Sequence, residues 1–272
     1  MDGILFGESI RWRDDRIWFA DWAAHEIIRL DPDGSSEVAA VVESFPLCFD
    51  FLPDGQMLVV DSSTRRLLVR QPDGSLATRA DLAPVCEKPW NDIVIDRRGN
   101  AYVDNINFDF PAGEPAPGLV ALVSPDGDIR VAAYDFAFPN GMAITPDGAT
   151  LLVAESHASR ISALSIASDG SLTERRVWAD TPGDHPDGIC LDAEGALWYA
   201  DVGNRRCVRV REGGEVLDLA ESDRGAFDCT LNLDAADPKL YVVGQEYGRP
   251  GGGEPTGQVL EFTAPAPGIT TR

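Results

Sequence analysis

Four oxygen-bearing side chains stand at matching positions of a sequence unit that repeats along the chain. Asn91, Asn140 and Asp187 each lie 8 residues before a turn glycine, at positions 99, 148 and 195. Glu8 lies 7 residues before Asp15, which takes the place of that glycine in its own unit. Matching positions of a radial repeat meet at one end of its axis, so we expect the four side chains to lie together.

The four side chains offer carboxylate and amide oxygens, which are the ligands that Ca²⁺, Mg²⁺ and Mn²⁺ prefer. Two carboxylates in a low-dielectric site repel each other unless a cation neutralises them. We therefore predict one bound divalent metal ion, Ca²⁺ before Mg²⁺ or Mn²⁺. Zn²⁺ is less favoured because no Cys or His stands at the matching position. Asn and Asp also cap turns where strands begin, but three identical offsets together with Glu8 favour the metal.

The repeated unit also predicts the fold. It contains a short apolar strand, a turn rich in Asp and Gly, a second strand that ends on a polar or small residue, and a third strand with Arg. Its six copies have second strands that end 40 to 50 residues apart, at Asp21, Asp61, Asn105, Glu155, Asp201 and Gly244. This spacing is typical of four strands per propeller blade, whereas a β-sandwich would not require six copies. We predict an all-β, six-bladed β-propeller with four-stranded antiparallel blades, formed by residues 1–272 as a single domain.

The sequence leaves open which terminus closes the ring and what the polar residues at the ends of the second strands do. Either residues 4–6 or the C-terminal residues 269–272 could supply the outer strand of the last blade. Two long loops, 108–118 and 247–257, follow second strands and should rise at the face that holds the four side chains. The polar residues that end the second strands would form a wider ring at this face. They either cap turns or, as we expect for Asn105, contact substrate hydroxyls.

Composition narrows the classes of partner. The net charge of −22 argues against nucleic acid and anionic membrane surfaces, since both require clustered Lys and Arg. Five cysteines without C-x-x-C spacing indicate neither a disulfide framework nor a zinc ribbon. The N-terminal residues do not resemble a signal peptide, and no apolar run approaches the length of a membrane span. We therefore expect a cytoplasmic protein that acts on a small molecule.

Histidine-based catalysis has little support in the sequence. The three histidines are scattered and no G-x-S-x-G motif occurs, which argues against a Ser-His-Asp hydrolase. His185 stands two residues before Asp187 and could reach the site as a proton shuttle. The alternative is an ordinary solvent-exposed loop histidine.

Four stretches resemble the SMP-30/gluconolactonase/regucalcin-like family: GESIRW from residue 7, PWNDIVID from 89, FPNGMAITPDG from 138 and HPDGICLDAEGALWYAD from 185. The resemblance extends over nearly the whole chain. It implies a six-bladed propeller that binds a divalent metal and hydrolyses a sugar lactone. It also implies that Glu8, Asn140 and Asp187 bind the metal, that Asp187 acts as general base, and that Asn91 contacts substrate or metal-bound water.

The chain departs from that family near the expected substrate site. Some lactonases of the family carry Arg two residues before the Asn of the N-D pair, and here that position holds Pro89. Aromatic side chains stand nearby in sequence, at Trp90, Phe108, Phe110 and Phe138. They suggest a more apolar pocket, with Trp90 as a substrate contact, or alternatively core between blades.

The expected reaction is the opening of a lactone to its hydroxy acid. The metal would polarise the carbonyl, and Asp187 would take a proton from the attacking water. Two alternatives stay open. One is phosphotriester hydrolysis at the same metal cup, as in diisopropylfluorophosphatase, and the other is a non-catalytic propeller with a structural calcium ion. The long loops over the metal face favour an enclosed site, and hence an enzyme.

Overall fold

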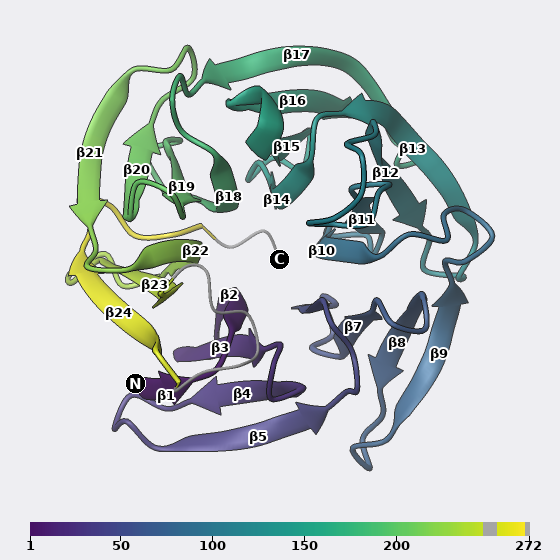
Figure 1. Cartoon of the computed structure of the whole chain (residues 1–272), viewed down its shortest axis with the longest axis horizontal. Coiled ribbons are helices and arrows are strands. Elements are labelled where there is room, and N and C mark those ends of the chain that lie inside the picture. The colour runs from purple at the N-terminus through teal and green to yellow at the C-terminus, as the bar shows by residue number, and fades with distance from the viewer. Residues whose placement is uncertain (247–254, 270–272) are drawn as a thin grey trace.

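The structure is a computed structural model that describes residues 1–246 and 255–269. Its strands form six four-stranded antiparallel sheets around one axis, as Figure 1 shows. The six-bladed β-propeller predicted from the repeat is therefore confirmed. A short 3₁₀ turn, η1 (Ser156–Ala158), follows the second strand of blade 4. None of the helices in the described ranges is long and apolar enough to cross a membrane.

The strands of each blade follow one another from the axis to the rim. Blade 1 contains β2 (Gly7–Arg13), β3 (Arg16–Asp21), β4 (Glu26–Leu30) and β5 (Ser36–Val41). Blade 2 contains β6 (Leu47–Phe51), β7 (Met57–Asp61), β8 (Arg66–Arg70) and β9 (Leu76–Asp81). Blade 3 contains β10 (Trp90–Ile95), β11 (Ala101–Asn105), β12 (Gly118–Val123) and β13 (Ile129–Phe136).

The second half of the ring repeats this order. Blade 4 contains β14 (Pro139–Ile144), β15 (Thr150–Glu155), β16 (Arg160–Ile166) and β17 (Leu172–Asp180). Blade 5 contains β18 (Pro186–Leu191), β19 (Leu197–Asp201), β20 (Arg206–Val210) and β21 (Val216–Glu221). Blade 6 contains β22 (Gly225–Leu231), β23 (Lys239–Gln245), β24 (Gly257–Thr263) and β1 (Asp2–Ile4).

The N-terminal strand closes the ring. β1 pairs with β24, with Asp2 opposite Gln258 and Ile4 opposite Gly257, and Figure 1 shows the N-terminus beside β24. Of the two possibilities left open by the sequence, the N-terminal residues therefore supply the outer strand, although it covers residues 2–4 and not the predicted 4–6. Residues 270–272 of the C-terminal alternative lie outside the described residues, as does most of the predicted loop 247–257.

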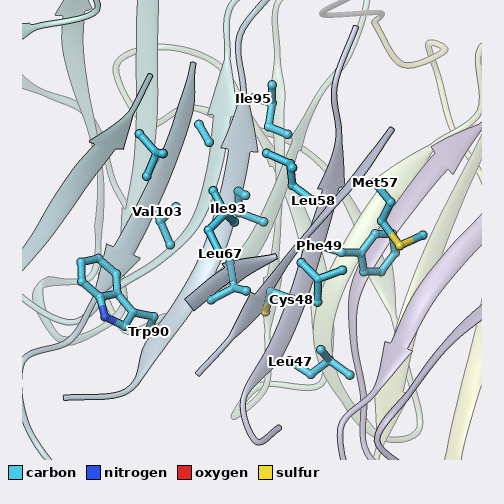
Figure 2. Close-up of a cluster of buried hydrophobic side chains, with 14 of the residues drawn as sticks. Leu47, Cys48, Phe49, Met57, Leu58, Leu67, Trp90, Ile93, Ile95 and Val103 are labelled. Carbon is cyan, nitrogen blue, oxygen red and sulfur yellow. The ribbon is translucent and has the colours of Figure 1, made fainter. Parts of the chain in front are cut away.

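Apolar side chains fill the spaces between neighbouring blades. Figure 2 shows one such cluster, in which Phe49 of β6 and Met57 of β7 belong to the same core as Trp90 and Ile93 of β10. Strands β6 and β11 are buried at every position, because the neighbouring blades pack against both faces of their sheets. This packing fixes how the innermost strands present their side chains to the axis.

The second strands end where the repeat predicts in five of the six blades. In blade 6, β23 extends one residue beyond the predicted Gly244, to Gln245. The Gln245 Oε1 atom accepts a hydrogen bond from the backbone N of Gly7 at 2.8 Å. This buried contact joins blade 6 to the first strand of blade 1.

Candidate functional site

The four side chains selected by the repeat lie near the starts of the innermost strands of blades 1, 3, 4 and 5. Each is partly exposed, and each is followed by a buried residue. The pairing of each innermost strand with its neighbour is irregular at this point. Such β-bulges re-aim side chains and are common beside functional sites. We call Glu8, Asn91, Asn140 and Asp187 the cup.

Direct contacts join the members of the cup. Asn91 Nδ2 donates to Asn140 Oδ1 at 3.0 Å, and the Asn140 side chain also hydrogen-bonds Asp187. Asn140 Nδ2 lies 3.3 Å from Ser156 Oγ, which helps to orient the amide. Glu8 lies close enough for the charge of Asp187 to influence its pKa. The structure thus brings together four side chains that are widely separated in sequence.

Glycines allow the innermost strands to approach each other at this level. A Cβ atom on Gly141 would lie 2.5 Å from the carbonyl O of Asp187. One on Gly188 would lie 1.8 Å from Asp228 Oδ1. Both distances are too short for any side chain, so only glycine fits at these two positions. In each case the glycine directly follows a residue of the cup, Asn140 or Asp187.

The cup is strongly acidic. Burial, followed by the charges of Asp187 and Asp228, raises the pKa of Glu8 well above its usual range. Burial, followed by Asp228 and Asp92, raises the pKa of Asp187 in the same direction, although its hydrogen bond with Asn140 opposes this shift. The dominant influences on both carboxyl groups therefore disfavour their charged forms, which is the condition that a bound cation would relieve.

A second layer of charge lies deeper along the axis. The guanidinium of Arg11 donates to Asp92 Oδ1 at 2.8 Å and to Asp228 Oδ2 at 3.2 Å, and so joins blades 3 and 6. Asp92 Oδ2 accepts from the backbone N of Met142 at 3.1 Å, and Asp228 Oδ2 from that of Ile10 at 2.8 Å. The charge of Arg11 is thus paired with these two carboxylates, and we call the three residues the Asp92–Arg11–Asp228 bridge.

Sequence reasoning missed this bridge. Asp92 directly follows Asn91, and Asp228 opens the sixth copy of the repeat, so the repeat could have indicated both positions. Arg11 carries no comparable signal. Its partners lie 81 and 217 residues away in the chain and meet it only because the ring closes.

The donor set fits a divalent cation that prefers oxygen. Within residues 1–246 and 255–269, no group of three or more His, Cys, Asp or Glu side chains is arranged to hold a metal ion. A site at the cup would therefore combine the carboxylates of Glu8 and Asp187 with amide oxygen and water. Such a mixed oxygen set suits Ca²⁺ better than Zn²⁺, which favours nitrogen and sulfur ligands.

Two residues predicted to contact substrate lie in the interior instead. Trp90 is 0% exposed, and its Nε1 donates to the carbonyl O of Cys86 at 3.3 Å. Asn105 is also 0% exposed, and its Nδ2 donates to the carbonyl O of Lys88 at 2.9 Å. Neither side chain is available to a substrate, so we do not retain them as substrate contacts.

Residues that end the second strands support the loops around the cup. Asp21 accepts hydrogen bonds from the backbone N of Leu5 and of Phe6, at 2.8 and 2.9 Å. Glu155 accepts one from the backbone N of Ala137 at 2.8 Å. These bonds fix the segments that lead into the innermost strands of blades 1 and 4. The wider ring thus includes turn-capping residues, as the alternative interpretation proposed.

An aromatic cluster flanks the cup on the side of blades 3 and 4. Phe138, two residues before Asn140, has its ring centroid 4.5 Å from that of His157 and 5.3 Å from that of Phe110. Phe108 packs against the same group and is buried. Phe110 is 57% exposed, so this cluster combines core with accessible apolar surface.

His185 lies at the edge of the same region. It is exposed, and its Nδ1 lies 2.8 Å from the carbonyl O of Ser156, the serine that Asn140 contacts. The contact places His185 one residue away from the cup in the hydrogen-bond network. Its role as a proton shuttle stays a prediction.

The chain is similar in sequence or in structure to several named proteins. The chain is 26% identical over 250 residues to L-arabinolactonase of Azospirillum brasilense, covering 89% of this chain and 81% of that protein. It matches a luciferin-regenerating enzyme with a TM-score of 0.83 and 19% identity, covering 99% and 95% of the two chains. It matches a calcium-binding protein, regucalcin, of Agrobacterium tumefaciens with a TM-score of 0.76 and 19% identity, covering 98% and 92%. At these identities the two structural matches support the fold alone.

The family model described as "SMP-30/Gluconolactonase/LRE-like region" matches residues 6–242, a range that includes the whole cup. The chain therefore belongs to the SMP-30/gluconolactonase/LRE-like family.

Proposed function

We propose that this protein is a metal-dependent lactonase that opens a sugar lactone to its hydroxy acid. The observation that carries the proposal is the pair of carboxylates in the cup, Glu8 and Asp187, whose pKa values are both raised by burial and neighbouring charge. An acidic cup of this kind favours the binding of a metal cation and disfavours the binding of an anionic ligand. The similarity to L-arabinolactonase supports a lactone as the substrate.

The metal ligands would be Glu8, Asn140 and Asp187, and we propose Ca²⁺ as the ion. A divalent cation held there would supply Lewis-acid polarisation of the lactone carbonyl. The β-bulges hold the three side chains on three different innermost strands, so the rigid ring sets their spacing. This rigidity provides the preorganised geometry that electrostatic catalysis requires.

Asp187 would act as the general base. It is partly exposed, so one of its oxygens can face solvent while the other faces the centre of the cup. In that position the carboxylate can take a proton from the attacking water. The Asn91 amide, fixed against Asn140 at 3.0 Å, would orient the water or the lactone ring oxygen. No covalent intermediate with the protein is required by this set of residues.

The test is hydrolysis of a panel of sugar and aliphatic lactones by metal-stripped protein, with Ca²⁺, Mg²⁺, Mn²⁺ and Zn²⁺ restored separately. Calorimetry measures metal binding apart from turnover. Asp187→Asn should lower kcat about 10²- to 10⁴-fold, as expected for loss of a general base. Asp126→Asn, at an exposed turn far from the axis, is the matched control and should behave as wild type.

Full turnover by Asp187→Asn with bound metal would rule out the general-base assignment. Tight metal binding without hydrolysis of any lactone would exclude the proposed activity. Phosphotriesters would then be the next substrates to test at the same cup.

A further inference from the structure

Three of the five free cysteines converge where blades 5 and 6 meet: Cys190 on β18, Cys207 on β20 and Cys229 on β22. The Sγ atoms of Cys190 and Cys229 lie 3.7 Å apart, which is a thiol–thiol contact between two innermost strands. Cys207 makes a second thiol contact with Cys229. The lactonase mechanism uses none of these sulfurs.

Two of the three cysteines line a cavity. It has a volume of about 360 Å³, and its lining includes Cys190, Cys229 and Arg11. It is also lined by Ile144 and Leu191, which lie at the far ends of their strands from the cup. The cavity therefore lies at the opposite end of the axis, beyond the Asp92–Arg11–Asp228 bridge.

The two thiols that line the cavity differ in their surroundings. Cys190 is partly exposed, and burial raises its pKa. Cys229 is 2% exposed, and hydrogen bonds from the Cys190 and Cys207 thiols lower its pKa to about 5. When protonated, Cys229 can donate instead to the carbonyl O of Gly188 at 3.7 Å. Cys229 thus has partners in both states, and a thiolate is the reactive form of cysteine towards oxidants.

From these contacts we propose that Cys190 and Cys229 form a peroxide-sensitive dithiol that oxidises to a disulfide between blades 5 and 6. The Cys229 thiolate attacks hydrogen peroxide, the O–O bond breaks, and the products are a sulfenic acid and hydroxide. The Cys190 sulfur then attacks the Cys229 sulfur and forms the S–S bond. The hydroxyl leaves and combines with the Cys190 proton as water. Peroxide is reduced to water as the two thiols are oxidised to one disulfide.

Little movement is needed for this bond. The sulfurs must close from 3.7 Å to about 2.05 Å. Rotation of the two side chains can supply part of this distance, since the cavity leaves room on one side. The bond would tie together two innermost strands that otherwise make no backbone ladder with each other.

The experiment treats the full-length protein with hydrogen peroxide, alkylates the remaining thiols under denaturing conditions, and maps the peptides without reduction. We expect a peptide pair cross-linked through Cys190 and Cys229, and dithiothreitol should break this cross-link. Cys48 and Cys86 should be found alkylated, because they remain free thiols. The oxidised protein should also show a higher Tm than the reduced protein. Cys190→Ser should remove the cross-link, and Cys86→Ser should leave it unchanged.

Oxidation of Cys229 to the sulfinic acid without a cross-link would overturn the proposal. So would a disulfide that joins Cys207 instead of Cys190. If a serine variant fails to fold, the peptide map of the wild-type protein still decides the question. The outcome is also independent of lactone hydrolysis, because neither thiol belongs to the cup.

Discussion

At the residue scale, the cup is a site whose charge the protein leaves uncompensated. Burial and neighbouring carboxylates raise the pKa of both Glu8 and Asp187. The Arg11 guanidinium, deeper in the axis, is already bonded to Asp92 and Asp228. The metal-free fold therefore carries a repulsion that a cation would relieve. Because a ligand that binds the folded state alone stabilises it, metal affinity and resistance to unfolding should be coupled.

We expect Glu8→Gln to stabilise the metal-free protein at neutral pH. Because the folded pKa of Glu8 is raised, the native state binds more protons than the unfolded state from about pH 4 up to that raised value. The free energy of unfolding of the wild type therefore falls as the pH rises through this window. The advantage of Glu8→Gln should be small near the lower limit and should grow towards neutrality. Urea unfolding in the presence of a chelator measures this difference.

Excess calcium should reverse the order, because the variant loses a metal ligand. Glu221→Gln is the matched control, since Glu221 is exposed on β21 at the rim. It should follow the wild type at every pH, with and without calcium. If Glu8→Gln did the same, the electrostatic description of the cup would be incorrect.

At the element scale, the cup depends on how closely β14, β18 and β22 approach one another. Gly188 is the tightest point, since a Cβ atom there would lie 1.8 Å from Asp228 Oδ1. We expect Gly188→Ala to push β18 and β22 apart and to lower the free energy of unfolding by about 1–3 kcal/mol, the usual cost of overpacking. The shift should also weaken calcium binding, because Asp187 precedes the substituted residue.

Gly203→Ala provides the comparison for this effect. The nearest atom to a Cβ at Gly203 is 3.9 Å away, and its backbone does not require the left-handed region. Urea unfolding and calcium calorimetry should show lower stability and weaker calcium binding for Gly188→Ala than for Gly203→Ala. Equal stability of Gly188→Ala and Gly203→Ala would show that the strand approach at Gly188 can relax.

The period of the repeat explains which residues could be predicted. Asn91, Asn140 and Asp187 were found because equal offsets in a radial repeat give equal positions on the axis. Trp90 packs in the core between blades, which is one of the two alternatives that the sequence left open for it. Arg11 could not be found at all, since its partners depend on ring closure rather than on local sequence.

At the scale of the whole molecule, the axis has two chemically different ends. The cup lies at one end, and the cavity with Cys190 and Cys229 lies at the other. The Asp92–Arg11–Asp228 bridge joins opposite sides of the ring between them. Both ends depend on a closed ring, because their residues come from blades that are distant in sequence. Closure rests on the pairing of β1 with β24.

Ile4 should be central to that closure. It is 1% exposed and belongs to a core shared by blades 6 and 1, whereas the adjacent Leu5 is 40% exposed. We expect Ile4→Ala to lower the free energy of unfolding by about 2–5 kcal/mol, as for other buried Ile residues. Leu5→Ala should change it by less than about 0.5 kcal/mol, as for most surface positions. Urea unfolding tests both variants. A similar small loss in the two would mean that β1 contributes little, and that the remaining three strands of blade 6 suffice to hold the ring closed.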